Sequence, residues 1–271
     1  FAGYFRKQVY QSAFLSKDET GVSVLDVKGP NGKPSTNGFM YITIGDTFDQ
    51  DTAKTRSLVL LEYIQGRSQE VLFEDIKRFG YEGYLMTDGL KGYLPYDKKK
   101  HCICWVHAVR KLKQLLKVNK KNTHALRIVK EAAKLYEIDE RYRKLLNSKE
   151  IDAQTFLSLR REESEKAIDT IYKIVAEVRV FYSHAGAIGD AVGYLEDHRI
   201  YMKNYLDVVE ATPSTNACER VAKSFATGRK NWLFTQTVDG ADASAFFYSI
   251  IETAKRAGLK IDDYLEAVCT F

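Results

Sequence analysis

The sequence predicts an α/β protein in which an α-helical insertion interrupts a mixed β-sheet. Runs rich in β-branched and aromatic residues, separated by turn residues, fill the beginning of the chain and are typical of strands. From Trp105 onward, apolar residues recur at helical spacing for about a hundred residues. With 271 residues, the chain is long enough to bury a sizeable core. These observations favour one large domain that carries a helical insertion.

The beginning of the chain predicts three antiparallel strands. A helix end at residues 4–11 leads into the first strand at 13–20, which residues 21–26 continue. Residues 28–38 are dense in Gly, Pro and Asn and predict a hairpin connection. The second and third strands are expected at residues 39–45 and 56–64.

A helix and two short strands follow. Residues 68–79 have apolar side chains at helical spacing, and Gly80 stands at a position typical of a helix C-cap. The strand at 84–87 ends at Asp88, and a fifth strand is expected at 101–106. Three antiparallel strands, a helix and two more strands are the order of a ribonuclease H-like sheet.

The remaining segments complete the predicted organisation. The highly charged tract 147–165 is expected to be a solvated helical face. Asn216 is a candidate N-cap for a helix at 217–227, which Gly228 would end. An extended segment at 229–234 and a helix at 242–257 are expected beyond it. The predicted parts are a first piece of the sheet domain at 1–108, an α-helical insertion at 109–204, and a second piece of the sheet domain at 205–271, which includes the helix that carries Glu219.

Basic residues are unevenly distributed along the chain. The formal net charge is only +5, yet nine Lys and Arg residues and no acidic residue lie between Lys98 and Lys121. Charge runs are often solvated faces, but a run without compensating acids favours a polyanionic partner such as DNA. Candidate contacts to the DNA backbone are Lys111, Lys113, Arg220, Arg229 and Lys230.

The composition indicates a cytoplasmic protein without a membrane partner. The four cysteines do not form a disulfide framework in a chain of this length, which favours reduced thiols. No apolar run approaches the roughly 20 residues of a membrane span. The chain begins at Phe1 rather than methionine, so we expect it to be a piece of a longer protein.

Three acids from separate parts of the chain are candidate metal ligands. Asp88 follows a strand and precedes a glycine, which would place its carboxylate at the rim of a sheet, although simple turns also use Asp-Gly pairs. Asp18 lies in the first strand, where only one of Asp18 and Glu19 can face the site. Glu219 completes the trio. Its spacing from Asn216 is also that of a capping box, in which Glu219 would bond back to the helix start.

A zinc interpretation concerns Cys104 and His107. Their Cys-x-x-His spacing, with His101 and Cys102 nearby, is that of half a zinc site. Structural zinc needs four ligands, and a second pair of ligands is not evident. We therefore favour a packing role for the pair, with His107 near the active site.

Several motifs, taken in order, resemble those of a known family. They are Lys17-Asp-Glu-Thr20, Thr87-Asp-Gly-Leu-Lys-Gly-Tyr93, Cys104-Trp-Val-His107 and Asn216-Ala-Cys-Glu-Arg220, followed by Gly228-Arg-Lys-Asn-Trp-Leu-Phe234. In this order they resemble the DDE transposases of the insertion-sequence sixty-six family. The resemblance covers nearly the whole chain and is loosest between Lys121 and Gly186.

This resemblance implies a ribonuclease H-like catalytic core. Asp18, Asp88 and Glu219 would be the catalytic residues and the ligands of two Mg²⁺ ions, which Mn²⁺ can replace. The implied reaction is hydrolytic nicking at transposon ends, followed by attack of the freed 3′-hydroxyl on target DNA. The protein would work as a homodimer in the synaptic complex, associated with the bacterial nucleoid. His107 and Asn216 are expected to lie beside the acids.

The chain departs from the family pattern at two places. Ser214-Thr215-Asn216 stands where the family commonly has Asp-Asn-Asn, and Ala108-Val-Arg-Lys-Leu112 where it usually reads closer to Ala-Arg-Arg-Lys-Phe. Two alternatives stay open. One is a ribonuclease H-like nuclease or resolvase that cuts without joining. The other, which the first departure keeps open, is a decayed, transposase-derived protein that binds DNA without cleaving it.

Overall fold

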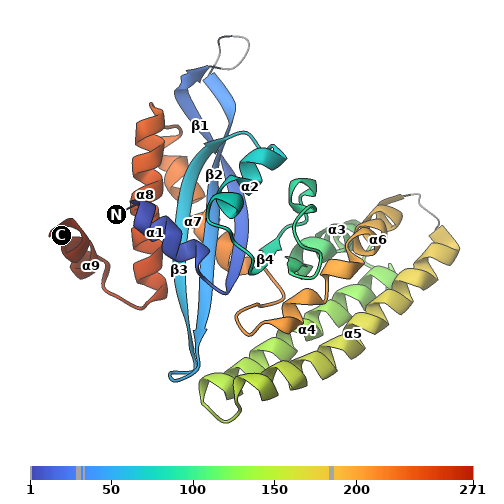
Figure 1. Ribbon diagram of the computed structural model, residues 1–271. Helices are drawn as coiled ribbons and strands as arrows, with labels where there is room; N and C mark the ends of the chain where they lie inside the picture. The colour runs from blue at the N-terminus through green and yellow to red at the C-terminus, as the bar shows by residue number, and fades with distance from the viewer. Residues whose placement is uncertain (1, 29–31, 33, 183–185, 271) are drawn as a thin grey trace.

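A five-stranded mixed sheet forms the centre of the structure, a computed structural model that describes residues 2–28, 32, 34–182 and 186–270. Its strands are β1 (Phe14–Lys28), β2 (Pro34–Asp49), β3 (Lys54–Gln65), β4 (Tyr84–Thr87) and β5 (His101–Ile103). They lie in the order β3-β2-β1-β4-β5 (Figure 1). The first three strands pair antiparallel, whereas β4 runs parallel to both β1 and β5. The predicted α/β class with a mixed sheet is confirmed.

Helices cover both faces of the long strands. They are α1 (Ala2–Tyr10), α2 (Gln69–Arg78), α7 (Asn216–Trp232) and α8 (Val238–Arg256), with α9 (Ile261–Thr270) packed on α8. One face shares a core with α1 and α2, to which Leu15 and Leu60 contribute. The other face packs against α7 and α8 through Ile42 and Leu61. Side chains alternate between these faces along each strand, so both faces are buried.

Local signals around α2 and the first hairpin were informative. The Ser68 hydroxyl accepts a hydrogen bond from the Val71 N–H and caps α2, and Gly80 just beyond the helix has a φ of +58°. The predicted turn at 28–38 includes residues 29–31 and 33, which lie outside the described residues. Strand β2 already begins at Pro34, earlier than expected.

Between β5 and α7 the described residues form four α-helices, which we call the helical block. They are α3 (Trp105–Val118), α4 (Thr123–Asn147), α5 (Ala153–Tyr182) and α6 (Gly186–Asp197). The block lies beside the β4 end of the sheet (Figure 1) and shares a core with β4 and β5 that includes Met86 and Trp105. The Trp105 indole is buried and donates to the Met202 carbonyl at 3.1 Å. None of the described helices is long and apolar enough to span a membrane. The boundaries predicted after residues 108 and 204 stay predictions.

Other predicted element boundaries are also wrong, including the start of α8, which begins at Val238 and not at residue 242. Strand β5 ends at Ile103, earlier than expected, because the chain turns into α3. Helix α7 does not stop at Gly228 but continues to Trp232, so most of 229–234 is helical rather than extended. Glycine at this position leaves room for a neighbour, since a Cβ at residue 228 would lie 2.4 Å from the Tyr248 hydroxyl. The glycine therefore reflects packing and not a helix end.

The charged tract 147–165 is not the uniformly solvated face that was predicted. Arg160 in α5 is fully buried and donates to the Asp139 carboxylate at 2.9 Å. It also donates to three backbone carbonyls, those of Tyr205, Val208 and Ala211. These carbonyls belong to the segment that leads into α7. The helical block therefore holds the approach to the helix that carries Glu219.

Candidate active site

Strand alternation separates Asp18 from its neighbour Glu19. Asp18 lies opposite Ile42 of β2, which belongs to the core beneath α7, so its side chain is on the α7 side of the sheet. Glu19 lies on the other face and forms an ion pair with Arg67. The tertiary structure thus distinguishes the two acids. It places Asp18 toward the helix of Glu219.

Asp88 directly follows β4, at the same level of the sheet as Asp18. Strands β1 and β4 run parallel with Ser16 beside Met86. Continuing both chains by two residues brings Asp18 and Asp88 to one rim, with side chains on the same face. The Asp88 carboxylate accepts a hydrogen bond from the Leu90 N–H at 2.9 Å, which fixes it in a tight turn.

Glu219 lies in the first turn of α7. The N-cap of this helix is Thr215. The prediction that Asn216 is the N-cap is therefore wrong. The Glu219 carboxylate reaches toward α3, where it accepts a hydrogen bond from Arg110 Nη2 at 3.0 Å and lies 3.8 Å from His107 Nε2. These contacts differ from those of a capping box, in which the glutamate would bond to the start of its own helix.

Asp88 and Glu219 lie close enough to Asp18 for their charges to influence its ionisation. Burial raises the pKa of Asp18 from its ordinary value of 3.8 to about 7. The hydrogen bond from the Glu19 N–H opposes this rise, and the negative charges of Glu19, Asp88 and Glu219 add to it. Burial is therefore the main cause of the raised pKa, and the contribution of the acidic neighbours shows that negative charges lie near Asp18.

His107 lies beside the same acids. Burial lowers the pKa of its imidazole and the Arg110 charge lowers it further, while the charges of Asp88 and Glu219 act in the opposite direction. Asn216 is exposed, and its backbone N–H contacts the Ser214 hydroxyl at 3.4 Å. The structure therefore brings His107, but not the Asn216 side chain, into recorded contact with the acids.

The three acids have the ligand chemistry that a hard cation prefers, but their side chains are not arranged to hold one. The carboxylate oxygens of Asp18, Asp88 and Glu219 are ligands that Mg²⁺ prefers, and their surplus negative charge favours a cation. Within the described residues, however, no three His, Cys, Asp or Glu side chains lie close enough together to hold a metal ion. Cys104 is buried and its sulfur accepts a hydrogen bond from the Thr215 N–H at 3.2 Å, a structural role.

Two contacts of this site could not be predicted from the chain. Arg110 was counted only within the basic run, although it follows His107 by one helical turn and so shares its face of α3. The Tyr194 hydroxyl of α6 donates to the Asp88 carbonyl at 2.6 Å. No local signal joins Tyr194 to Asp88, because the contact spans the helical block.

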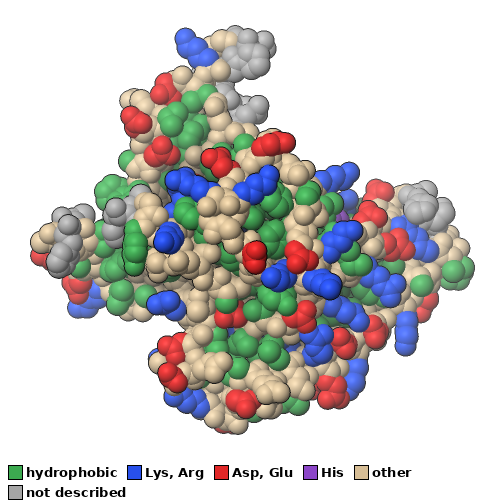
Figure 2. All heavy atoms as spheres, in the orientation of Figure 1, with side chains coloured by type: hydrophobic (Ala, Val, Ile, Leu, Met, Phe, Trp, Pro, Cys, Tyr) green, Lys and Arg blue, Asp and Glu red, His purple; other side chains and the backbone are tan. Residues whose placement is uncertain are grey.

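The predicted DNA contacts divide between α3 and α7. Four of them are exposed, Lys111 and Lys113 on α3 and Arg220 and Lys230 on α7. Arg229 is partly buried, and its guanidinium donates to the Gly21 carbonyl, so it ties α7 to β1. Figure 2 shows basic side chains interspersed with acidic ones over the helical block. The acid-free run in the sequence is therefore not an acid-free surface.

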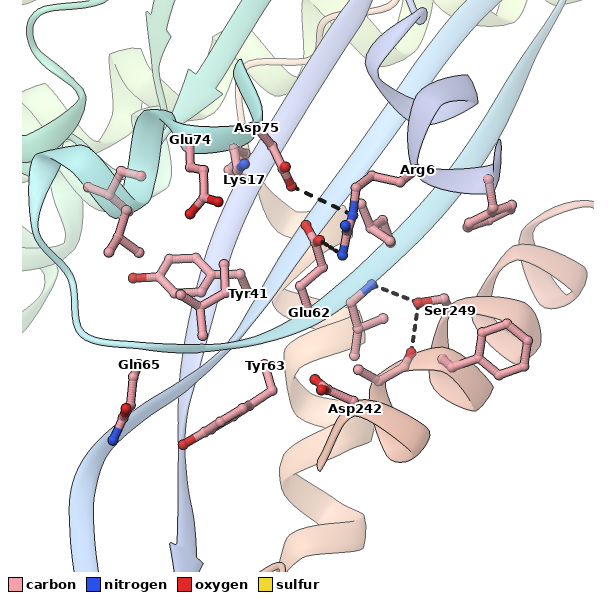
Figure 3. A pocket seen from close by; sticks show the side chains of 18 of the residues that line it. Arg6, Lys17, Tyr41, Glu62, Tyr63, Gln65, Glu74, Asp75, Asp242 and Ser249 are labelled. Carbon is pink, nitrogen blue, oxygen red and sulfur yellow. Dashed lines mark hydrogen bonds and ion pairs between the residues drawn. The ribbon is translucent and has the colours of Figure 1, made fainter. Parts of the chain in front are cut away.

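A separate pocket of about 620 Å³ lies around the edge strand β3, and the three candidate acids do not line it. Arg6, Glu62 and Asp75 point toward one another inside it (Figure 3). Arg6 pairs with Glu62 at 2.5 Å and lies 3.7 Å from Asp75. Burial and the Asp75 charge raise the pKa of Glu62 to about 7. These buried charges connect α1, α2 and β3 and are distinct from the acids at the β1–β4 rim.

Fold and site together define an α/β protein with a mixed sheet, in which Asp88 and Glu219 lie near enough to Asp18 for their charges to affect its pKa. A family model described as "Transposase IS66 family" matches residues 1–243. The chain belongs to the IS66 family of transposases, as its ordered motifs predicted.

Curated relatives include uncharacterized proteins of Sinorhizobium fredii (strain NBRC 101917 / NGR234). Protein y4hP is 25% identical over 194 residues, which cover 65% of this chain and 34% of y4hP. Protein y4jD is 26% identical over 206 residues, covering 73% of this chain and 39% of y4jD. Protein y4qI is 21% identical over 280 residues, covering 99% of this chain and 49% of y4qI. The chain thus spans less than half the length of these relatives. No solved structure matches it.

Proposed function

We propose that this chain is the catalytic part of a DDE transposase. In this proposal it nicks DNA at transposon ends and joins the freed 3′-hydroxyl to target DNA. The observation that carries the proposal is that Asp88, which follows β4, and Glu219 of α7 lie near enough to Asp18 of β1 to affect its pKa. Burial raises the pKa of Asp18 most, and the charges of Glu19, Asp88 and Glu219 raise it further. Family membership supports a transposase.

The strand order supports a ribonuclease H-like core. Three antiparallel strands, with β4 and β5 added in parallel beside β1, give the order β3-β2-β1-β4-β5. The parallel register places the end of β4 beside the first part of β1, just before Asp18. A carboxylate on each strand can then contribute to one site, with α7 supplying the third from the face of the sheet.

Two Mg²⁺ ions are the proposed cofactors, with Mn²⁺ as a substitute. Asp18, Asp88 and Glu219 would hold them, and bound ions would activate the attacking oxygen and stabilise the leaving one. The chain's own residues orient the carboxylates. Leu90 N–H holds Asp88, and Arg110 holds Glu219 on the α3 side.

DNA is the proposed partner, through basic residues that flank the acids. Lys111 and Lys113 extend from the same helix as His107, and Arg220 follows Glu219 directly. The Arg110 side chain beside Glu219 is half-exposed. Its guanidinium can therefore pair with a phosphate as well as with a carboxylate. The homodimer expected for synapsis stays a prediction.

A nicking assay tests this proposal. Purified protein with Mg²⁺ and a labelled transposon-end duplex should give a nicked product, and Asp88→Asn should abolish it. Glu19→Gln is the matched control, because Glu19 is the neighbouring acid on the opposite face of the sheet. Wild-type nicking by Asp88→Asn would show that the catalytic assignment is wrong. A nicked product that is never joined to target DNA would indicate a nuclease instead.

One observation favours the alternative of a protein that binds DNA without cleaving it. Glu219 pairs with Arg110, and the described acids do not form a group of three close enough for a metal ion. Such a protein would bind DNA in a salt-sensitive manner. It would give no nicked product with Mg²⁺ or Mn²⁺.

A further inference from the structure

We propose that Tyr194 of α6 is a positioning residue that fixes the Asp88 turn for metal binding. The inference rests on the proposed function, because it assigns Tyr194 a role toward a ligand of the proposed metal site. It gives the helical block a direct part in building that site.

The first observation is a hydrogen bond between distant parts of the chain. The Tyr194 hydroxyl donates to the backbone carbonyl of Asp88 at 2.6 Å. Within the turn, Leu90 N–H donates to the Asp88 carboxylate and Gly89 N–H donates to the Thr87 hydroxyl. Just before Asp88, the Thr87 carbonyl accepts a hydrogen bond from the Cys104 N–H at 3.0 Å. Among the described residues, Tyr194 donates to the Asp88 carbonyl itself, on the other side of the carboxylate.

The second observation is how closely α6 approaches the turn. Gly89 has a φ of +86°, a backbone conformation that favours glycine. A Cβ at residue 89 would lie 2.2 Å from the Tyr194 hydroxyl and 3.3 Å from His198 Nε2. Only a residue without a side chain fits between the turn and these two rings.

The third observation is that Tyr194 is itself held in place. Its ring packs on that of His198 with centroids 4.1 Å apart, and His198 Nδ1 lies 2.8 Å from the Tyr194 carbonyl. The neighbouring residues Ala191, Val192 and Leu195 of α6 are buried in the core of the helical block. The packing of α6 and of the His198 ring thus fixes the position of the Tyr194 hydroxyl.

These contacts bear on the carboxylate through the backbone. A peptide held at its carbonyl has little freedom to rotate, so the attached carboxylate keeps its direction toward the rim shared with Asp18. Without the hydroxyl, the partly buried Asp88 carbonyl loses its donor, and the remaining long-range bonds of the turn are those of Thr87, before the carboxylate. Groups that orient metal ligands in this way commonly change metal affinity by about 10-fold or more when removed.

Tyr194→Phe tests the inference, with Tyr172→Phe as the matched control. The Tyr172 hydroxyl also donates to a backbone carbonyl, that of Leu195 at 3.1 Å, but it has no recorded contact with the Asp88 turn. The measurement is the rise in melting temperature of DNA-free protein as Mn²⁺ is added. We expect Tyr194→Phe to need about 10-fold more Mn²⁺ for the half-maximal rise than wild type, and Tyr172→Phe to match wild type.

The contrary results separate the inference from the proposed function. Equal Mn²⁺ requirements for Tyr194→Phe and wild type would overturn the role of Tyr194 alone, provided that Asp88→Asn abolishes the Mn²⁺ response. The inference also fails if Tyr172→Phe shifts the requirement as much as Tyr194→Phe does. It fails again if Tyr194→Phe melts far below Tyr172→Phe without metal, because the tyrosine would then be mainly structural. A wild-type protein with no Mn²⁺ response would overturn the metal assignment itself.

Discussion

Asp18 in β1 and Asp88 at the end of β4 lie at one rim of the sheet, although two strands and a helix separate them along the chain. The parallel pairing of Ser16 with Met86 sets this level, because side chains two residues further on point to the same face. Glu219 approaches the same rim from α7. The acidic character of the site therefore follows from strand register and from the packing of one helix.

The raised pKa of Asp18 predicts a pH-dependent gain in stability for Asp18→Asn. The pKa of Asp18 is about 7 in the folded state and 3.8 ordinarily, so ionisation of this carboxyl destabilises the fold as pH rises between these values. The loss of folding free energy is complete above pH 7. The substitution should stabilise the fold at pH 8 by at most about 4 kcal/mol. At pH 4 the gain should nearly vanish. Urea unfolding at the two pH values measures it.

Asp152→Ala provides a control of opposite sign for that experiment. The Asp152 carboxylate accepts a hydrogen bond from the Thr155 N–H, which lowers its pKa. Its stabilising effect is present above the ordinary pKa and is lost as pH falls, so Asp152→Ala should destabilise at pH 8 and not at low pH. An Asp18→Asn gain that is equal at pH 4 and pH 8 would contradict the raised pKa of Asp18.

Arg110→Ala should weaken DNA binding without unfolding the protein. Its ion pair with Glu219 is half-exposed, and pairs of this kind contribute less than about 1 kcal/mol to folding. If Arg110 contacts a phosphate, the slope of log affinity against log salt should fall by about 1. Arg127→Ala is the matched control, since Arg127 is similarly exposed and pairs with Glu177. The same change in slope for both variants would exclude a specific role for Arg110.

Arg160→Met should destabilise the fold strongly. The fully buried guanidinium serves Asp139 and the carbonyls before α7, and removing one partner of a buried pair costs about 3–5 kcal/mol. Urea unfolding should show a lower midpoint. Arg161→Met, one residue along, changes an exposed pair with Asp207 and should stay within about 0.5 kcal/mol of wild type. Similar losses for both variants would refute the importance of burial here.

Gly89→Ala should destabilise more than Gly258→Ala. Both glycines have positive φ, at +86° and +69°, but only an alanine at residue 89 would meet neighbouring atoms. The shared conformational cost is about 1–2 kcal/mol, and the clash with the Tyr194 hydroxyl adds to it at residue 89. The cost of Gly89→Ala should therefore shrink in a Tyr194→Phe background, as thermal unfolding of the double mutant would show. Strictly additive effects would mean that the hydroxyl does not crowd the turn.

Much of the sheet could be predicted because its signals are local. The β-branched and aromatic runs of the first strands, the helical repeat before Gly80 and the short run that ends at Asp88 each depend on neighbouring residues only. The ordered motifs around Asp18, Asp88 and Glu219 likewise indicated the family. The prediction that Gly228 ends α7 was wrong, because glycine can end a helix but can also make room for a neighbouring side chain, here that of Tyr248.

By itself, the sequence determined the class of fold, the family and the identity of the candidate acids. Only the tertiary structure decided that Asp18 rather than Glu19 faces α7, that Glu219 pairs with Arg110, and that Tyr194 holds the Asp88 turn. Each of these depends on contacts between residues far apart in the chain. Periodicity reports which face of its own element a residue occupies, but the partner on that face is set by how the elements pack.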